Sequence, residues 1–409
     1  MIRNKTWVKD NIVLLGAAKA TTHYTIGSGT KLAMEDAIVL LNAMRSTPLI
    51  PYALLRYETL RDEEVGKTQH SSDVSLQWFE EMERHWNLEP EQLAFGVMSR
   101  SKQTTYENLL LRDASFTETV QEWFLDSGRS QGFDVAPGTP PIFTPFRLRD
   151  MVVSNRVVVS PMAQYSATEG LPNDWHLVHL GSRVIGGAGL NFVEMTCPDP
   201  DARITPGCTG LWNEAKRDAW PRHKPLSVRI SATDWAPGGL SGDDLVALAR
   251  LFKEAGADLI DVSTGQTVPY QDPVYGRMFQ TPFADRVRLE AGISTMAVGN
   301  VTTPDQVNTI LLQGRADLVA LARPHLTNPY FTLQASAWYQ HEAQFWPNQY
   351  LSGKRQAFRL AEHERNESIE TSIALRPPMH EVQEEVDKSG SSQSAGVCSP
   401  RPEPQGESS

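Results

Sequence analysis

The sequence is poor in cysteine. Its 409 residues include only three, Cys197, Cys208 and Cys398. An odd number at wide spacing fits neither a framework of disulfides nor a zinc site. We therefore expect a protein of a reducing, cytosol-like compartment.

Positive charge and long apolar runs are also scarce. The formal net charge of −11 disfavours nucleic acid and anionic membrane surfaces as partners. No apolar stretch approaches the roughly 20 residues that a membrane span needs. The first residues, MIRNKTWVKDN, contain no apolar segment of the signal-peptide type. These absences predict a cytoplasmic protein.

Hydrophobic residues make up 40% of the chain, enough for a sizeable core, and four zones can be distinguished. Residues 1–46 have the pattern of strand, Gly-rich turn and helix. Residues 47–135 are mostly helical in pattern. In residues 141–359, after a Pro-rich joint, apolar segments alternate with helical ones. Residues 360–409 are rich in Ser, Pro, Glu and Gln, so we expect a disordered tail.

The third zone contains six apolar segments that are typical of strands: NRVVVSPM, GLNFVEMT, PLSVRIS, ADLIDVST, STMAVGN and ADLVALA. Helical patterns separate them, as in residues 242–256 and 302–314. Strands that are each followed by a helix indicate a parallel α/β fold. Both a doubly wound sheet and a β/α barrel satisfy this pattern.

The last two of these strands end in residues suited to an anion. Gly299 allows close approach of the backbone, the helix that follows favours negative charge at its N-terminus, and Arg323 can add a charge-assisted contact. A cofactor phosphate is one interpretation. Two ordinary strand ends beside a surface arginine are the other. Arg229 lies inside the PLSVRIS strand, and a buried arginine there needs an anionic partner, such as the N1–O2 edge of a reduced flavin.

These strand ends belong to three long motifs, RLRDMVVSNRVVVSPMAQYSA, DWHLVHLGSRVIGGAGLNFVEMTCPDPDARITPGCTGLWNE and DLVALARPHLTNPYF. In this order, over about residues 143–359, they resemble old yellow enzyme, the family of FMN-dependent ene-reductases and NADH:flavin oxidoreductases. The resemblance implies a (β/α)8 barrel of the TIM type, with FMN as cofactor and NAD(P)H as reductant, whereas FAD is not expected. It places Tyr165 near the substrate. The residues that it assigns to FMN are Ser160, Pro161, Met162 and Thr196 at the isoalloxazine, Arg229 at N1–O2, and Gly299, Asn300, Ala322 and Arg323 at the phosphate.

The N-terminal zone resembles a different family. NIVLLGAAKATTHYTIGSGTKLAMEDAIVLLNAM is similar to the C-terminal part of the FAD-binding region of flavoprotein aromatic hydroxylases. RYETLRDEEVGKTQHSSDVSLQWFEEMERHW and FGVMSRSKQTTYENLLLRD match one group, bifunctional proteins that join such a monooxygenase to an old yellow enzyme domain. That group acts on aminobenzoyl-CoA or salicylyl-CoA. The resemblances imply a small-molecule substrate, an activated alkene or an aromatic acyl-CoA thioester, and leave a homo-oligomer open.

The chain departs from both patterns. The G-x-G-x-x-G unit that cradles the ADP half of FAD is absent, and Gly16-Ala17 stand where the hydroxylases have Gly-Asp, so the first zone is expected to be a structural remnant. Near residues 220–225 the old yellow enzyme pattern has two further strand–helix units, each on the order of 30 residues. These units normally supply a His pair that binds the substrate carbonyl. His176, His179 and His223 do not stand in that context and are interpreted as structural.

Six strands of an eight-stranded design are expected to leave apolar edges, because strand number, tilt and shear must agree for a barrel to close. Loss of the carbonyl-binding pair is expected to remove most ene-reductase activity. The favoured function is that of an FMN-dependent NAD(P)H oxidoreductase, a degenerate relative of the bifunctional enzyme. One alternative is a catalytically dead, truncated protein or gene-model artefact that binds flavin weakly or not at all. Another is an unrelated barrel enzyme that binds a sugar phosphate.

Overall fold

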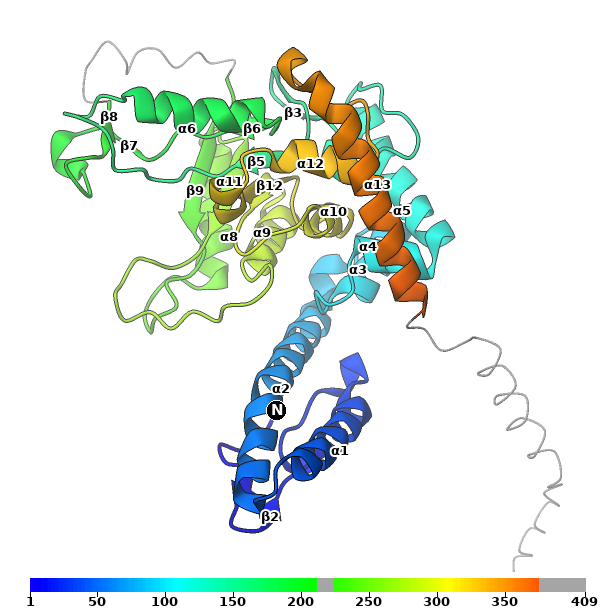
Figure 1. Ribbon diagram of the computed structural model, residues 1–409. Coiled ribbons are helices and arrows are strands. Elements are labelled where there is room, and N and C mark those ends of the chain that lie inside the picture. The colour runs from blue at the N-terminus through cyan, green and yellow to red at the C-terminus, as the bar shows by residue number, and fades with distance from the viewer. Residues whose placement is uncertain (212–223, 375–409) are drawn as a thin grey trace, which may run out of the picture.

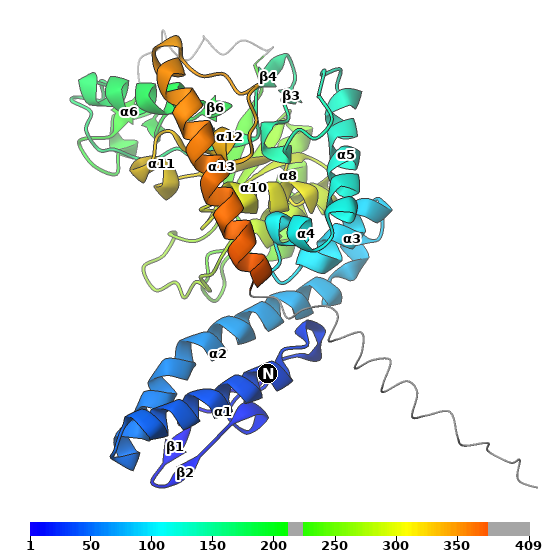
Figure 2. The ribbon, with the colours of Figure 1, turned by 45° about the vertical axis from the view of Figure 1, so that its right-hand side comes forward.

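A computed structural model describes residues 1–211 and 224–374 of the chain. Its N-terminal part is a hairpin of two long helices that projects from the rest of the molecule (Figures 1 and 2). Two short antiparallel strands, β1 (Val8–Lys9) and β2 (Ile12–Val13), precede α1 (Gly29–Ser46) and α2 (Ile50–Glu80). At their interface the buried Asp36 carboxylate accepts hydrogen bonds from Arg61 Nε at 2.8 Å and from the Gly16 amide at 2.9 Å. A buried ion pair thus holds the hairpin together.

Three shorter helices link the hairpin to the body of the molecule. They are α3 (Pro90–Ser99), α4 (Tyr106–Arg112) and α5 (Ala114–Ser130). Helix α4 begins where Thr105 and Asn108 form a capping box, which satisfies amide groups that the first helical turn leaves unpaired. The helical character expected for residues 47–135 is therefore present.

The body is built on one six-stranded parallel sheet. In the order in which they lie, the strands are β6 (Leu190–Asn191), β5 (Val157–Val159), β12 (Leu318–Leu321), β11 (Ser294–Ala297), β10 (Leu259–Ser263) and β9 (Ser227–Ser231). Each of the six predicted segments supplies one of them. Within the described residues β6 and β9 do not pair with each other, so the sheet is an open part of a barrel.

Apolar side chains reach solvent near both edges of this sheet. Leu226, which precedes β9, is 40% exposed, and Val193, which follows β6, is 55% exposed. These are the apolar edges expected from a barrel that lacks two strand–helix units.

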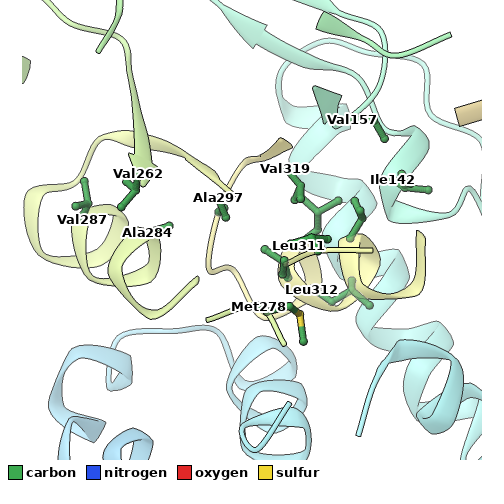
Figure 3. Packing of buried hydrophobic residues seen from close by; sticks show 14 of the residues in the cluster. Ile142, Val157, Val262, Met278, Ala284, Val287, Ala297, Leu311, Leu312 and Val319 are labelled. Atoms are coloured by element: carbon green, nitrogen blue, oxygen red, sulfur yellow. The ribbon is translucent and has the colours of Figure 1, made fainter. Parts of the chain in front are cut away.

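Helices cover the outer face of the sheet. They are α6 (Asp174–Ile185), α8 (Gly242–Glu254), α9 (Thr281–Arg286), α10 (Pro304–Leu312), α11 (Arg323–Thr327) and α12 (Phe331–Trp338), with a π-helical turn (Val287–Ala291) after α9. Figure 3 shows the core between them, where Val319 of β12 lies near Leu311 of α10 and Val262 of β10 lies near Ala284 of α9. Burial of each such side chain contributes about 1.5–3 kcal/mol.

The inner face of the sheet is buried as well. Val158, Met296 and Leu318 pack there against an antiparallel pair, β3 (Phe146–Leu148) and β4 (Met151–Val153). Burial on both faces explains why the strands appear in the sequence as continuous apolar runs. A further short parallel pair, β7 (Thr196–Cys197) and β8 (Thr209–Gly210), lies beyond β6.

The expectation of disorder from residue 360 onward is wrong for residues 360–374. They continue α13 (Leu351–Ala374), which packs on α12 and buries Phe358 beside Trp346. Polar composition suggested disorder, but Ala, Glu and Arg favour helix once a packed first half has nucleated it. The expectation for residues 375–409 lies outside the described residues. None of the helices described is both long and apolar enough to cross a membrane.

Candidate functional site

A cavity of about 550 Å³ opens at the carboxyl ends of β10, β11 and β12. The loops after these strands line it at residues 264–266, 298–302 and 322–324, and the segment 271–280 forms another wall. In a parallel α/β fold these loops meet at one edge of the sheet, which is where such folds bind ligands. Gly299, Asn300, Ala322 and Arg323, four of the predicted site residues, therefore lie together.

The backbone at Gly299 requires glycine. Its φ of 107° lies in the left-handed region, and a Cβ there would be 2.7 Å from Gln280 Cδ. Asn300 follows with a φ of 52°, and its side-chain amide donates to the Gly276 carbonyl at 2.9 Å. These two residues form a tight turn that exposes backbone to the cavity.

This wall of the cavity carries free hydrogen-bond donors. Within the described residues, the backbone amides of Gly299, Asn300 and Arg323 donate to no acceptor, and the exposed Arg323 guanidinium has no carboxylate partner. Successive free amides beside a cation match the chemistry of a phosphate group. The geometry agrees with a phosphate cradle, and the assignment of these residues to a phosphate stays a prediction.

Arg229 lies at a second group of predicted residues, outside this lining. Its Nη2 donates to Ser160 Oγ at 3.0 Å, and its Nε donates to Asp261 Oδ2 at 2.6 Å. The expectation of a buried arginine is wrong, because the side chain is 36% exposed. Its anionic partner in the chain is Asp261, whose carboxyl pKa is raised by burial while Arg229 opposes the rise. Nη1 makes no bond among the described residues and can still donate to a ligand.

A sequence model of the NADH:flavin oxidoreductase / NADH oxidase family matches residues 141–222 and 216–340. These matches contain the sheet, the cavity and the arginine just described. Residues 141–340, just under half of the chain, are similar to this family, and they are called the oxidoreductase domain from here on. The domain is of the FMN- and NAD(P)H-dependent oxidoreductase type.

Curated relatives of the domain are bacterial enzymes named NADPH dehydrogenase. One from Listeria innocua is 27% identical over 318 residues, covering 48% of this chain and 94% of its own length. One from a Geobacillus species is 27% identical over 320 residues, covering 48% and 93%. Among solved structures, the old yellow enzyme from Trypanosoma cruzi covers 51% of this chain and 93% of its own, at 11% identity and a TM-score of 0.39.

The Listeria alignment measures what this oxidoreductase domain lacks. The alignment spans 318 positions but includes only 48% of the 409 residues of this chain, or about 196. About 120 positions of the relative therefore have no counterpart here. The family match also falls into two segments that meet at residues 216–222. The loss is about twice the length of two strand–helix units of about 30 residues each. Most of the predicted junction, residues 220–225, lies outside the described residues.

The other predicted residues of the oxidoreductase domain sit at strand ends away from the cavity lining. Pro161 and Met162 are half-buried after Ser160, and Thr196 Oγ1 donates to the Glu194 carbonyl at 3.0 Å. Tyr165 is 47% exposed with a φ of 51° and is not part of the cavity lining. The structure thus brings four predicted residues together at the cavity. It joins Ser160 to Arg229 in a second group, with Pro161 and Met162 next in the chain. No hydrogen bond among the described residues joins Thr196 or Tyr165 to that group.

The histidines of α6 have structural partners. His176 Nε2 lies 2.7 Å from Glu194 Oε1, and its Nδ1 accepts the Asn173 amide at 3.1 Å, so both ring nitrogens are engaged. Burial lowers the pKa of His179, which keeps that ring neutral. These contacts agree with the structural interpretation. His223 lies outside the described residues.

Two residues of the site were not identified from the sequence. Asp261 pairs with Arg229 from the neighbouring strand β10, and Gln280 packs on Gly299 with its Oε1 buried and unpartnered. The alternation of β10 placed Asp261 on the side of the sheet that carries Arg229, and this was the available signal. No pattern in the sequence indicated Gln280, because its approach to Gly299 depends on the course of a long loop.

Proposed function

We propose that this chain binds FMN across the two groups of residues and oxidises NAD(P)H. When bound, FMN supplies a ring that accepts a hydride from the nicotinamide and passes it to an acceptor. The observation that carries the proposal is the turn at Gly299–Asn300 beside Arg323, where free amides and a free guanidinium suit the FMN phosphate.

Each group has a separate task. Gly299, Asn300, Ala322 and Arg323 hold the phosphate through backbone donors and one cation. Arg229 donates through its free Nη1 to the N1–O2 edge, and Asp261 and Ser160 fix the guanidinium for that task. Ser160, Pro161, Met162 and Thr196 contact the isoalloxazine, and Tyr165 stands near the substrate.

In this proposal the chain retains electron transfer from flavin to oxygen or quinones and has lost most of its ene-reductase activity. Reduction of an activated alkene or an aromatic acyl-CoA thioester needs donors that hold the substrate carbonyl. Both nitrogens of His176 are already bonded, and the relatives have about 120 aligned positions that this chain lacks. The substrate is therefore a small electron acceptor that needs no carbonyl clamp.

The N-terminal zones have a separate origin in this proposal. Residues 1–46 and 47–135 descend from a flavoprotein hydroxylase, and the whole chain is a reduced relative of the bifunctional monooxygenase/reductase. The hairpin of α1 and α2 projects from the body (Figure 2) and exposes Met34, Ile38 and Leu41, which supports an origin in a larger protein where these side chains were covered. The cofactor in this proposal is FMN and not FAD.

A second candidate is a protein that has lost flavin binding. The open edges at β6 and β9 favour it, because the wall between them would flank the isoalloxazine in a closed barrel.

One absorbance experiment separates the two candidates. The purified chain is incubated with FMN and desalted, and its absorbance is then recorded across the visible bands of flavin. Retained flavin in the wild type and its loss in Arg323→Met support the proposal. A soluble, colourless wild type overturns it, and retention in Arg323→Met places the phosphate elsewhere. Arg355→Met, which removes an exposed arginine of α13, is the matched control.

A further inference from the structure

A second cavity lies beside the first, between α2 and the barrel domain. It measures about 690 Å³ and is lined by residues 66–71 of α2, by residues 101–103 and by residues 275–277. Tyr275 and Gly276 contribute to both cavities, so the two sites share one wall. None of the residues assigned to FMN lines this second cavity.

Lys102 is the unusual residue of this second cavity. It is 6% exposed, and its ammonium donates to the Met278 carbonyl at 2.9 Å. An ammonium has three donors, and in the described part of the chain no carboxylate forms an ion pair with this one. A buried cation without a counter-charge is costly, and burial lowers the pKa of this lysine to about 7, so an anion in the cavity would stabilise its charged form.

The neighbouring side chains of the lining also include basic residues. His70 Nε2 is buried without a partner and lies against Gly276, where a Cβ would come within 2.5 Å of it. Arg277 is exposed at the rim and has no ion pair among the described residues. Lys67 is already paired with Glu63 and Glu64 at 2.9 and 2.8 Å. The lining itself contains no acidic residue.

We propose that this cavity is a binding site for a phosphate-bearing small molecule, anchored by Lys102. Lys102, with two ammonium hydrogens left to donate, His70 and Arg277 line the cavity from three segments, which suits an anion with several acceptor oxygens better than a single carboxylate. Lys102 binds the phosphate at the buried end, His70 donates beside it, and Arg277 closes the rim. The site does not depend on FMN binding in the first cavity.

Isothermal titration of the full chain with inorganic pyrophosphate tests the site. FMN is left out, because it carries a phosphate itself and would compete for the site, and the Arg323→Met variant distinguishes binding here from binding at the phosphate cradle. The wild type is expected to bind saturably, Lys102→Met about tenfold more weakly or worse, and Lys67→Met within about twofold of the wild type. Lys67→Met is the matched control, because it removes a cation from the same lining that already has partners.

Other variants keep the proposal falsifiable. Arg277→Gln changes an exposed rim residue, so it folds as the wild type does, and it is expected to weaken pyrophosphate about threefold to tenfold. Absence of saturable binding, or equal affinity in wild type and Lys102→Met, overturns the site. Binding that is lost in Arg323→Met but kept in Lys102→Met assigns the anion to the FMN cradle and also overturns it. A colourless chain that still binds pyrophosphate through Lys102 refutes the proposed function alone.

Discussion

Arg229 Nη2 lies 3.0 Å from Ser160 Oγ, although β10, β11 and β12 separate their two strands in the sheet. In a flat sheet, strands four positions apart are about 19 Å from each other. The hydrogen bond therefore requires a sheet that curls until its two flanks face each other. The oxidoreductase domain keeps the curvature of a barrel without its closure, and Arg229 bridges the interior.

The first prediction concerns this bridge. Arg229→Met leaves the buried Asp261 carboxylate without its partner and is expected to lower the free energy of unfolding by about 3 kcal/mol. Urea denaturation followed by tryptophan fluorescence measures the loss. Arg229→Met combined with Asp261→Asn should recover more than half of it, because the unpaired charge is then gone. A double variant as unstable as the single one contradicts this account.

The second prediction concerns the FMN cradle. Gly299→Ala adds a Cβ at a φ of 107° and 2.7 Å from Gln280, so FMN should bind about tenfold more weakly or worse. Fluorescence quenching of FMN during titration measures the affinity. Gly181→Ala is the matched control, since that glycine lies in α6 with no atom near the added Cβ and no positive φ. Equal affinity in both variants would place FMN away from this turn.

The third prediction tests the role of His176. His176→Ala removes the partner of the buried Glu194 and is expected to destabilise the domain by about 2 kcal/mol. The rate of NADPH oxidation per bound flavin should stay within about twofold of the wild type, because neither ring nitrogen is free to reach a substrate. His363→Ala, at an exposed position of α13, serves as control. A large fall in the rate at unchanged stability would make His176 a substrate ligand instead.

The sequence predicted the strands of this fold more reliably than their partners. Apolar runs buried on both faces located all six strands, because this signal is local, whereas the assignment of Gly299 and Arg323 to a phosphate stays a prediction. The pairing of Arg229 with Asp261 depends on which strands become neighbours, and the approach of Gln280 to Gly299 depends on a long loop. Helix α13 was missed beyond residue 359, since composition alone does not show that Phe358 anchors it.

The fourth prediction is a pH dependence that originates at Lys102. Burial and, to a smaller extent, the charge of Arg315 lower its pKa to about 7. His70 and Arg277 line the same cavity, and a neighbouring cavity that Lys102 also lines contains Asp73, Glu81 and Arg84. The folded state therefore disfavours the charged lysine. The charged lysine lowers the free energy of unfolding by its full amount below pH 7. This loss disappears as the pH rises toward 10.5, the pKa of the lysine in the unfolded chain.

Without anion, Lys102→Met should therefore have a higher urea midpoint than the wild type at pH 7. Its free energy of unfolding should be higher by up to about 4 kcal/mol. The difference should shrink steadily when the midpoints are measured at pH 8, 9 and 10. Pyrophosphate should narrow the gap at pH 7, because it stabilises only the wild type. A difference that is constant across this range would mean that the lysine is not charged and unpaired in the folded state.

The fifth prediction concerns the open edge at β9. Leu226 is 40% exposed beside β9, whose edge away from β10 pairs with no strand among the described residues, and such an edge is a template for pairing with a second chain. Leu226→Lys places a charge at this edge and should lower light scattering at high protein concentration, with the urea midpoint nearly unchanged because the side chain is already half in water. Leu60→Lys on α2, which is 53% exposed and far from the sheet, is the control for added charge. Equal suppression by both variants would assign the association to net charge. Suppression by Leu226→Lys alone would show that the strand edge drives it, since only that variant changes the surface next to β9.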